Sequence, residues 1–257
     1  MPPHSEKPAI VLVQGAFQTA LVYKALCTSL QSRGSHAVLP ALPSCSDVEN
    51  EDFPTRSLTD DAAVITKAIE QLVDEGKRVV VAMHSYGGIV GSEAIPESLS
   101  YTARQAQGLA GGVVHLFYYA AFVLKVGTTV LETFGESPNG DARDDGRFGI
   151  KNGAKTLYGD LPDAEATMWE SRLIPQSYKV QSTPTTRAAY LYIPSTYLVC
   201  ENDQAVPAEY QRMFAALAGA EVDTWNTGHS PMLSHTDMLV EKIVRIADRA
   251  VAAVGGG

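Results

Sequence analysis

Short β-branched and apolar runs alternate along the chain with segments whose apolar residues recur at helical spacing. The short runs are Ala9 to Val13, Ala37 to Leu39, Arg78 to Ala82, Gly112 to Tyr118, Thr196 to Cys200 and Glu221 to Trp225. Such alternation is typical of parallel strands joined by crossover helices. The pattern therefore predicts an α/β fold with a doubly wound, mostly parallel sheet of about six strands.

Two of the intervening segments carry clear helix signals. The first begins at Ser57, where a serine cap is followed three residues later by Asp60, and apolar residues then recur at helical spacing as far as Val73. The second begins with Ser234 as its expected cap and continues toward the glycine-rich end of the sequence. Each carries one apolar stripe, so we expect both to pack on the sheet, the second as the terminal helix.

The stretch from Leu124 to Ile193 breaks this alternation. It opens with a loop rich in Gly, Asn, Asp and Arg from Ser137 to Gly149, and helical patterns follow from Pro162 to Leu173 and around Gln176 to Val180. A mobile surface excursion is the alternative interpretation, but an uncovered loop has little reason to carry so many apolar side chains. We expect an inserted helical cap without strands.

Composition and length fit one globular domain with such an insertion. The chain has 257 residues, 45% of them hydrophobic and 19% charged, which excludes a disordered or fibrous protein. We expect a core formed by residues 1–123 and 194–257, and a cap formed by residues 124–193. The formal net charge of −9 leaves no broad basic surface, which argues against nucleic acid and anionic membranes as partners.

No targeting or membrane segment is recognisable in the sequence. Met1 to Pro8 contains charges and prolines but no apolar stretch, and nowhere do 18 apolar residues follow one another. We therefore expect a cytoplasmic protein. Cys27, Cys45 and Cys200 form no C-x-x-C pair and no zinc pattern, which predicts neither a disulfide framework nor a metal site. Cys27 and Cys200 fit core positions, whereas Cys45 lies in a Pro-Ser-rich loop and is expected to be exposed.

The segment from Val79 to Gly88 carries the strongest chemical signal. A β-branched run leads into Ser85, and two glycines follow before a helical stretch begins. Strand, serine, tight turn and helix together hold a serine in a strained conformation with its hydroxyl exposed for attack. A surface serine in an ordinary β–α turn is the alternative. The usual pattern has glycine two residues before the serine, where this chain has Met83.

A nucleophilic serine needs a base, and the base needs an orienting acid. His229 is the candidate base, because it lies in a turn directly after the last strand, at the sheet edge where Ser85 must also lie. A turn histidine bound to backbone is the alternative. The acid is expected in the loop after the preceding strand, where we favour Asp203 and keep Glu201 in reserve. The remaining histidines are assigned to an arm (His4), strands (His36, His115), the serine turn (His84) and the last helix (His235).

Two backbone N–H groups are needed to bind the developing oxyanion. We assign them to Tyr86, which follows the serine, and to Ala16 in the loop after the first strand. That loop matches no G-x-G-x-x-G or Walker pattern, so a nucleotide site is not indicated. Phe17, Phe122 and Trp169 are candidate apolar walls of a substrate pocket and Gln18 a polar contact, with a core role for each aromatic equally open.

Four segments together resemble the α/β-hydrolase superfamily, and within it the small esterase and hydroxynitrile lyase group. They are Val11 to Phe17, Ala82 to Gly88, Tyr197 to Pro207 and Gly228 to Pro231, and the resemblance spans nearly the whole chain. It implies Ser85 as nucleophile, Asp203 as acid, His229 as base, and Ala16 and Tyr86 as oxyanion donors. The chain departs from the family at Gln14, where histidine is common, and at Met83; Gln14 can still hydrogen-bond the loop.

Details of the resemblance favour the esterase-like branch. The lyases carry a threonine in the oxyanion loop and a lysine after the catalytic histidine, where this chain has Gly15 and Ser230. Relatives that cleave halides or epoxides use an aspartate where Ser85 stands. We expect hydrolysis of a carboxylic ester or lactone by a Ser-His-Asp triad without a cofactor. The expected partner is a small-molecule substrate, and a homodimer is compatible with this picture.

Two other functions stay open at this point. The same triad can drive C–C cleavage, cyclisation or elimination on a polyketide-like substrate in a biosynthetic enzyme. Alternatively, the fold can serve as a ligand receptor without turnover, in which the cap signals to a partner. Fast hydrolysis of simple nitrophenyl esters would weaken the case for the biosynthetic enzyme. Tight ligand retention with negligible turnover, and a partner whose binding depends on the cap, would favour the receptor.

Overall fold

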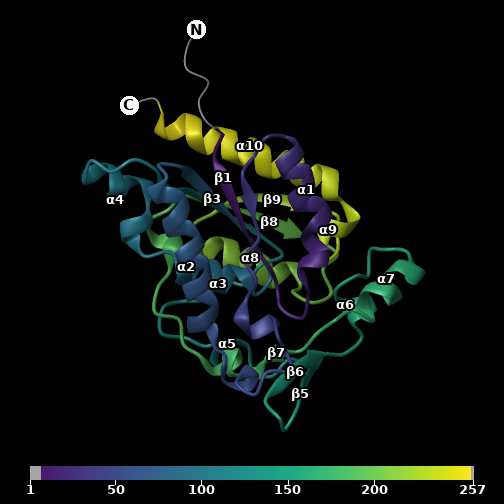
Figure 1. Ribbon diagram of the computed structural model, residues 1–257. Coiled ribbons are helices and arrows are strands. Elements are labelled where there is room, and N and C mark those ends of the chain that lie inside the picture. Colours follow the sequence, from purple (N-terminus) through teal and green to yellow (C-terminus); the bar gives the residue numbers. More distant parts are fainter. Residues whose placement is uncertain (1–6, 256–257) are drawn as a thin grey trace.

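The computed structural model describes residues 7–255, and its centre is a parallel sheet of six strands (Figure 1). The spatial order is β2-β1-β3-β4-β8-β9, and every pair in it is parallel. The strands are β1 (Ala9–Val13), β2 (Ala37–Val38), β3 (Arg78–His84), β4 (Gly112–Tyr119), β8 (Ser195–Cys200) and β9 (Glu221–Trp225). All six expected strands are present, which confirms the α/β fold.

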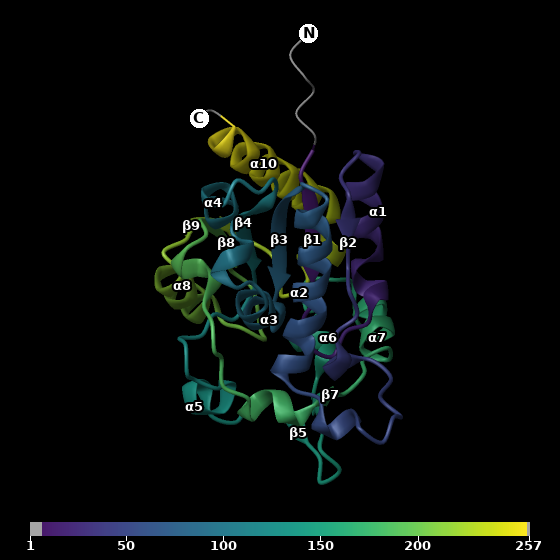
Figure 2. The ribbon, with the colours of Figure 1, turned by 60° about the vertical axis from the view of Figure 1, so that its left-hand side comes forward.

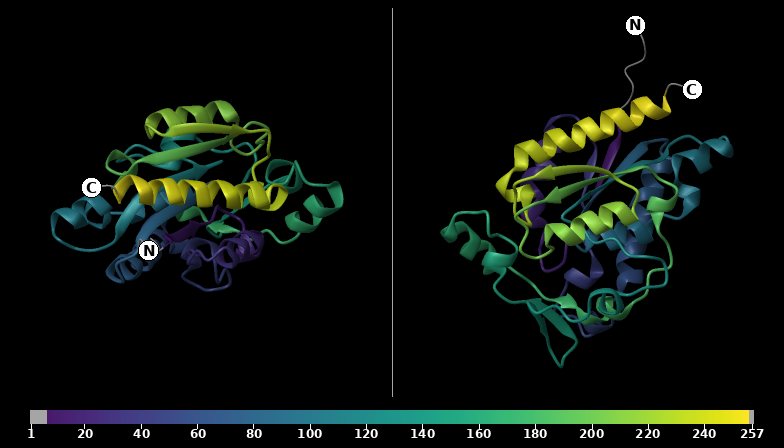
Figure 3. Two further views of the ribbon diagram at one scale, coloured as in Figure 1. Left: turned by 90° about the horizontal axis from the view of Figure 1, so that it is seen from above. Right: turned by 180° about the vertical axis from the view of Figure 1, so that it is seen from behind.

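Helices cover both faces of this sheet (Figure 2). One face packs on α2 (Leu58–Asp74), α3 (Gly87–Ala94) and α8 (Ala208–Leu217), and the other packs on α1 (Lys24–Ser32) and α10 (Thr236–Val254). Figure 3 shows α10 as one long helix beside the strands. The short helix α4 (Tyr101–Ala106) contacts β4, and the short helix α9 (Pro231–Ser234) contacts α10.

Successive residues of a central strand enter different cores. In β1, Val11 and Val13 face the α2 and α3 side, whereas Ile10 and Leu12 face the α1 and α10 side. Because both faces are covered, the strand is apolar at every position and shows no polar alternation.

Both helices with clear sequence signals, α2 and α10, are present, but α10 begins later than expected. The helix α2 has the expected capping box, in which the backbone N–H of Ser57 donates to Asp60 over 2.8 Å. The terminal helix begins at Thr236, so Ser234 is not its cap. The Ser234 hydroxyl instead donates to Asp160 Oδ2 over 2.7 Å, a contact far away in the sequence.

The segment of residues 124–193 is inserted between β4 and β8, and it contains strands that the sequence did not predict. A three-stranded antiparallel sheet is formed by β5 (Gly140–Ala142), β6 (Arg147–Ile150) and β7 (Gln176–Ser177), beside α5 (Val130–Phe134), α6 (Gly153–Thr156) and α7 (Asp163–Glu170). The prediction of a strand-free insertion was wrong, because strands of two to four residues are too short to show a period of two. Figures 1 and 2 place this sheet at the opposite end of the molecule from the end of α10.

The inserted segment also explains a second correction. Cys45, expected to be exposed, is buried, because Gln176 of β7 covers it with its Nε2 3.6 Å from the thiol sulfur. Cys200 is buried and Cys27 half-buried, as expected for core positions. None of the helices in residues 7–255 combines the length and apolar character needed to cross a membrane.

Candidate active site

The turn between β3 and α3 holds Ser85 in a strained conformation. Its φ of +52° lies in the left-handed region, which non-glycine residues seldom adopt. The Ser85 carbonyl accepts hydrogen bonds from the N–H groups of Gly88 and Phe122, both over 3.0 Å. A Cβ on Gly87 would lie 2.4 Å from the carbonyl oxygen of Val13, so this turn closes only with glycine at that position.

The unusual Met83 is accommodated by a glycine in the next helix. Met83 is fully buried between β3 and α3, and its sulfur lies where a Cβ on Gly91 would be only 2.4 Å away. The glycine that is usual at position 83 of the strand is absent, and Gly91 in the helix provides the space instead. The strand and helix still pack closely, and Ser85 keeps its position at the bend.

His229 and Asp203 are brought together by the loops that follow β9 and β8. The Nδ1 atom of His229 lies 2.8 Å from Asp203 Oδ2, and both side chains are buried. Asp203 is itself held by the N–H groups of Ala205 and Val206 and by Gln211 Nε2, over 2.8 to 3.0 Å. The carboxylate is therefore fixed by backbone and amide donors as well as by the imidazole.

The reserve candidate for the acid lies elsewhere. Glu201 pairs with Arg212 on α8, at a partly exposed position. Gln211, which the sequence gave no reason to single out, supports Asp203 and also bonds the backbone of Cys200 and Val206. Glutamine on a helix has many roles, so only the fold could reveal this one.

The loop after β1 approaches the serine turn closely. A Cβ on Gly15 would lie 2.9 Å from both the Ser85 Cβ and the His84 ring, so only glycine fits there. Gln14 closes the loop by donating from Nε2 to the carbonyl oxygen of Gln18 over 2.9 Å. Ala16 and Tyr86 both line the pocket that contains Ser85, and within residues 7–255 neither backbone N–H donates a hydrogen bond. Two residues whose backbone N–H groups have no partner in this part of the chain thus line the same pocket as the serine.

A buried network that the sequence did not predict connects these loops. His84 Nε2 lies 2.8 Å from the carbonyl oxygen of His229, and Nδ1 lies 2.7 Å from the hydroxyl of Tyr23. Burial and the nearby His229 lower the pKa of His84 well below its usual range, so the ring is neutral. Because a carbonyl only accepts, Nε2 carries the proton. The Tyr23 oxygen also accepts from the N–H of Gly15, and its single proton lies within reach of two acceptors, the unprotonated Nδ1 of His84 and Gln18 Oε1 2.8 Å away.

Ser85 and His229 open into a pocket of about 460 Å³ with aromatic walls. Phe17 packs against Phe148 of β6 on one side, with ring centroids 5.5 Å apart. Another wall is a group of aromatic side chains from the core and the inserted segment: Phe122, Phe134, Tyr210 and Phe214. The pocket volume lies within the range of about 300–1,000 Å³ that holds drug-sized ligands.

Two residues expected in this pocket do not line it. Gln18 is buried behind the loop, where its Nε2 bonds Tyr158 and Ser230 over 3.4 and 3.2 Å. Trp169 lies on α7, where the guanidinium of Arg172 sits 5.0 Å from its ring centroid. Phe17 and Phe122 do line the pocket. The sequence distinguished apolar from polar positions but not which aromatic ring reaches the cavity.

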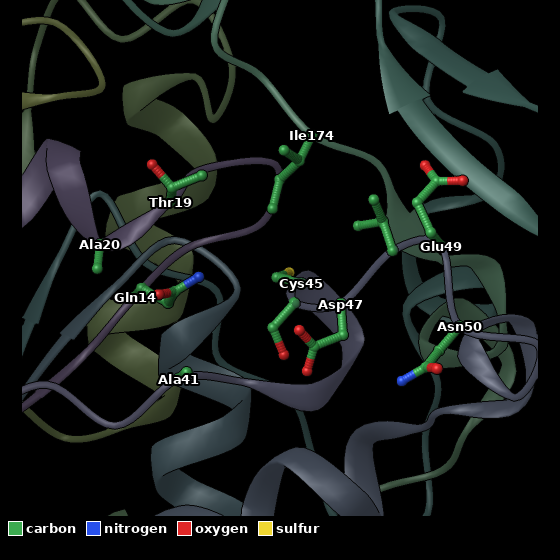
Figure 4. Close-up of a pocket in the computed structure, with 11 residues that line it drawn as sticks. Gln14, Thr19, Ala20, Ala41, Cys45, Asp47, Glu49, Asn50 and Ile174 are labelled. Atoms are coloured by element: carbon green, nitrogen blue, oxygen red, sulfur yellow. The ribbon is translucent and has the colours of Figure 1, made fainter.

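A second hollow, of about 710 Å³, lies beside the loop after β1 (Figure 4). Its lining includes Gln14, Cys45, Asp47, Glu49 and Ile174. It contains neither Ser85 nor His229, so the smaller pocket is the candidate active site. Within residues 7–255 no group of three or more His, Cys, Asp or Glu side chains is arranged to hold a metal ion.

Comparisons with known proteins agree with this fold. The family model of the alpha/beta hydrolase family matches residues 10–242. The alpha/beta hydrolase nvfD of Aspergillus novofumigatus is 33% identical over 253 residues, covering 95% of this chain and 98% of that protein. Polyneuridine aldehyde esterase shares the fold with a TM-score of 0.73 at 15% identity, covering 94% of this chain and 99% of its own. A pyrethroid hydrolase from Sphingobium faniae shares it with a TM-score of 0.69 at 20% identity, covering 94% and 97%. The resemblance in the sequence is confirmed, and the chain belongs to the α/β-hydrolase family.

Proposed function

We propose that this protein is a serine hydrolase that cleaves a small to medium carboxylic ester or lactone through an acyl-enzyme on Ser85. The observation that carries the proposal is a single pocket that contains Ser85 at its strained turn, His229 and two free backbone amides. Asp203 binds the far side of the imidazole. This is the arrangement that nucleophilic serine chemistry needs.

The proposed reaction follows from the contacts of the imidazole. Asp203 holds the Nδ1 proton of His229, which leaves Nε2 free to take the proton of the Ser85 hydroxyl. The serine oxygen attacks the carbonyl carbon, and the amides of Ala16 and Tyr86 bind the negative oxygen that forms. His229 then gives its proton to the leaving alkoxide. Water, deprotonated by His229, attacks the acyl-enzyme and releases the acid.

The walls of the pocket favour a substrate with an apolar ring. Phe17 and Phe148 on one side, and Phe122 and Phe134 on the other, offer aromatic faces against which a ring can stack. Polar side chains also line the pocket: Thr133, Asn139, Gln176, Gln181 and Gln204. We propose an ester or lactone with an apolar, ring-containing body and at least one polar substituent.

Residues 124–193 act as a cap in this proposal. The segment supplies lining from several of its elements, including Phe134 of α5, Phe148 of β6 and Gln176 of β7. Ser85 and His229 come from the sheet loops, so the pocket is closed jointly by both parts of the chain. Specificity would therefore depend on the cap, and the chemistry on the core.

A serine-directed fluorophosphonate and a panel of esters test the proposal. The wild-type protein should be labelled on Ser85 and should hydrolyse aryl and cyclic esters or lactones faster than short aliphatic ones. Ser85→Ala should lose labelling and reduce kcat on the order of 10⁶-fold. The matched control is Ser92→Ala, which removes a buried hydroxyl on the next helix, bonded to Tyr118 over 2.8 Å. Persistent labelling and unchanged hydrolysis in Ser85→Ala would refute the assignment.

A further inference from the structure

A buried carboxyl group lies behind the proposed oxyanion hole. Asp61 is on the first turn of α2, and its side chain is fully buried. Its Oδ2 accepts hydrogen bonds from the hydroxyls of Ser44 and Tyr86 over 2.6 and 2.7 Å, and its Oδ1 accepts from the Ser44 N–H over 2.8 Å. The carboxyl thus ties together the turn at Ser44, the start of α2 and the residue that follows the nucleophile.

No basic side chain balances this charge. Within residues 7–255 Asp61 forms no salt bridge, and the nearby guanidinium of Arg56 binds Asp52 and the carbonyl oxygens of Pro43 and Ser46. Three hydroxyl or N–H donors therefore stand in for a cation. An uncompensated buried carboxyl is costly to keep, which is the kind of feature that functional sites tend to retain.

Of the buried titratable groups in this cluster, Asp61 is the one that changes charge near neutral pH. They are Tyr86 from the serine turn, Cys45 from the turn at Ser44, and Asp60 next to it on α2. Burial raises the pKa of Cys45 to about 12 and that of Tyr86 well above its usual range, so both stay neutral. Burial also raises the pKa of Asp61 to about 6.

Tyr86 connects this group to the reaction. Its backbone N–H is one of the two proposed oxyanion donors, and its buried side chain is held at the hydroxyl end by Asp61. A ring fixed at both ends restricts how the peptide between Ser85 and Tyr86 can rotate. The direction of that N–H is what determines whether it reaches the oxyanion.

We infer that Asp61 is a positioning residue for the oxyanion hole, which it orients through the hydroxyl of Tyr86 when its carboxyl group is ionised. This inference rests on the proposed function. The preference for the ionised form follows from the hydrogen bonds, because a carboxylate accepts from these three donors more strongly than a neutral carboxyl group does. A proton on Oδ2 displaces one of its two hydroxyl donors, and a proton on Oδ1 leaves Oδ2 a weaker acceptor for both.

The rate of phosphonate labelling at Ser85 tests this inference without knowledge of the substrate. Tyr86→Phe keeps the ring and removes the bond to Asp61. We expect labelling and kcat to fall on the order of tenfold, less than the 10²- to 10³-fold loss seen when an oxyanion donor is removed, with KM within about twofold. The control is Tyr118→Phe, which removes the hydroxyl of another fully buried tyrosine, bonded to Ser92. It should match Tyr86→Phe in stability loss but not in rate.

The pH dependence supplies the second readout. A single required base gives a limiting slope of one in the logarithm of the labelling rate against pH on the acid side. Because loss of the Tyr86 bond lowers the rate only about tenfold, protonation of Asp61 should add a further fall of about one logarithmic unit around pH 6 to the wild-type profile. Both Tyr86→Phe and Asp61→Asn should lack this additional fall. The double variant should lose no more rate than either single variant.

The outcomes separate this inference from the function on which it rests. A wild-type profile without the additional fall around pH 6, together with equal labelling rates in Tyr86→Phe and Tyr118→Phe, would overturn the role of Asp61 and leave the hydrolase proposal intact. Absence of Ser85 labelling in the wild-type protein would overturn the proposed function itself. If Asp61→Asn does not fold, Tyr86→Phe still decides the question, because it retains the carboxyl group.

Discussion

The contact between Met83 and Gly91 predicts that Gly91→Ala destabilises the native protein but stabilises a variant that lacks the Met83 side chain. In the native chain, Gly91→Ala places a Cβ 2.4 Å from the Met83 sulfur and 2.8 Å from its Cγ. Met83 is fully buried, so its side chain must shift against β3 and α3 at a cost of about 1–3 kcal/mol. Alanine improves the helix by about 1 kcal/mol relative to glycine, which offsets only part of that cost.

The background with Met83→Ala reverses this balance. Removing the methionine side chain alone should destabilise the protein by about 2–5 kcal/mol, because it leaves a cavity. Gly91→Ala then meets no sulfur, fills part of the cavity and gains the helix preference, so it should stabilise this background by about 1 kcal/mol. The coupling between the two positions should be about 2 kcal/mol.

Urea unfolding of the four proteins measures this coupling directly, provided that the m-values agree. Because Met83 lies two residues before Ser85, the labelling rate at the serine should fall in Gly91→Ala and recover in the double variant. Changes in unfolding free energy that add within about 0.5 kcal/mol would show that the two side chains do not compete for one space. The explanation of Met83 as a strand-to-helix exchange with Gly91 would then be wrong.

Three further changes test other contacts. Asp203→Asn should lower kcat on the order of 10⁴-fold with KM nearly unchanged in ester hydrolysis, and full activity would exclude it as the acid. Asp160→Ala removes the acceptor of the Gly228 N–H and the Ser234 hydroxyl, and should cost about 1–3 kcal/mol in urea unfolding; an unchanged midpoint would contradict this. The folded-state pKa of Asp61, raised to about 6 from a usual 3.8, predicts that this group's contribution to wild-type stability falls by about 3 kcal/mol from pH 4 to 6 and then levels off. Asp61→Asn should lack that fall. A variant whose unfolding free energy changed with pH in parallel with that of the wild-type protein would refute the raised pKa of Asp61.

The parts of the fold that the sequence predicted are those with local causes. The four central strands β1, β3, β4 and β8 are runs buried on both faces, and α2 is delimited by a capping box and one apolar stripe. The positions of Ser85, Asp203 and His229 also follow from local patterns, since each comes directly after a strand of one parallel sheet. Parallel strands end at the same edge, so these loops must meet.

The parts that were missed depend on contacts between distant segments. Cys45 is buried because Gln176, 131 residues away, covers it. The strands β5 and β6 are defined by their partners and not by a periodic pattern. Gln18 lies 212 residues from Ser230, and a polar residue beside a proposed oxyanion loop gives no sign that it faces away from the pocket.

The connections to the inserted segment change how the site is understood. Asp160 and Tyr158 lie in that segment, yet they bond the turn that carries His229 and the loop that carries Ala16. A cover that only excluded water would need no buried polar contacts with the catalytic loops, because apolar packing closes a pocket equally well. Hydrogen bonds, unlike apolar contacts, fix direction as well as distance. The segment that supplies part of the pocket lining therefore also holds, through Asp160 and Tyr158, the loops of the proposed triad and oxyanion hole, so we expect changes in this segment to alter the rate of the chemical step as well as binding.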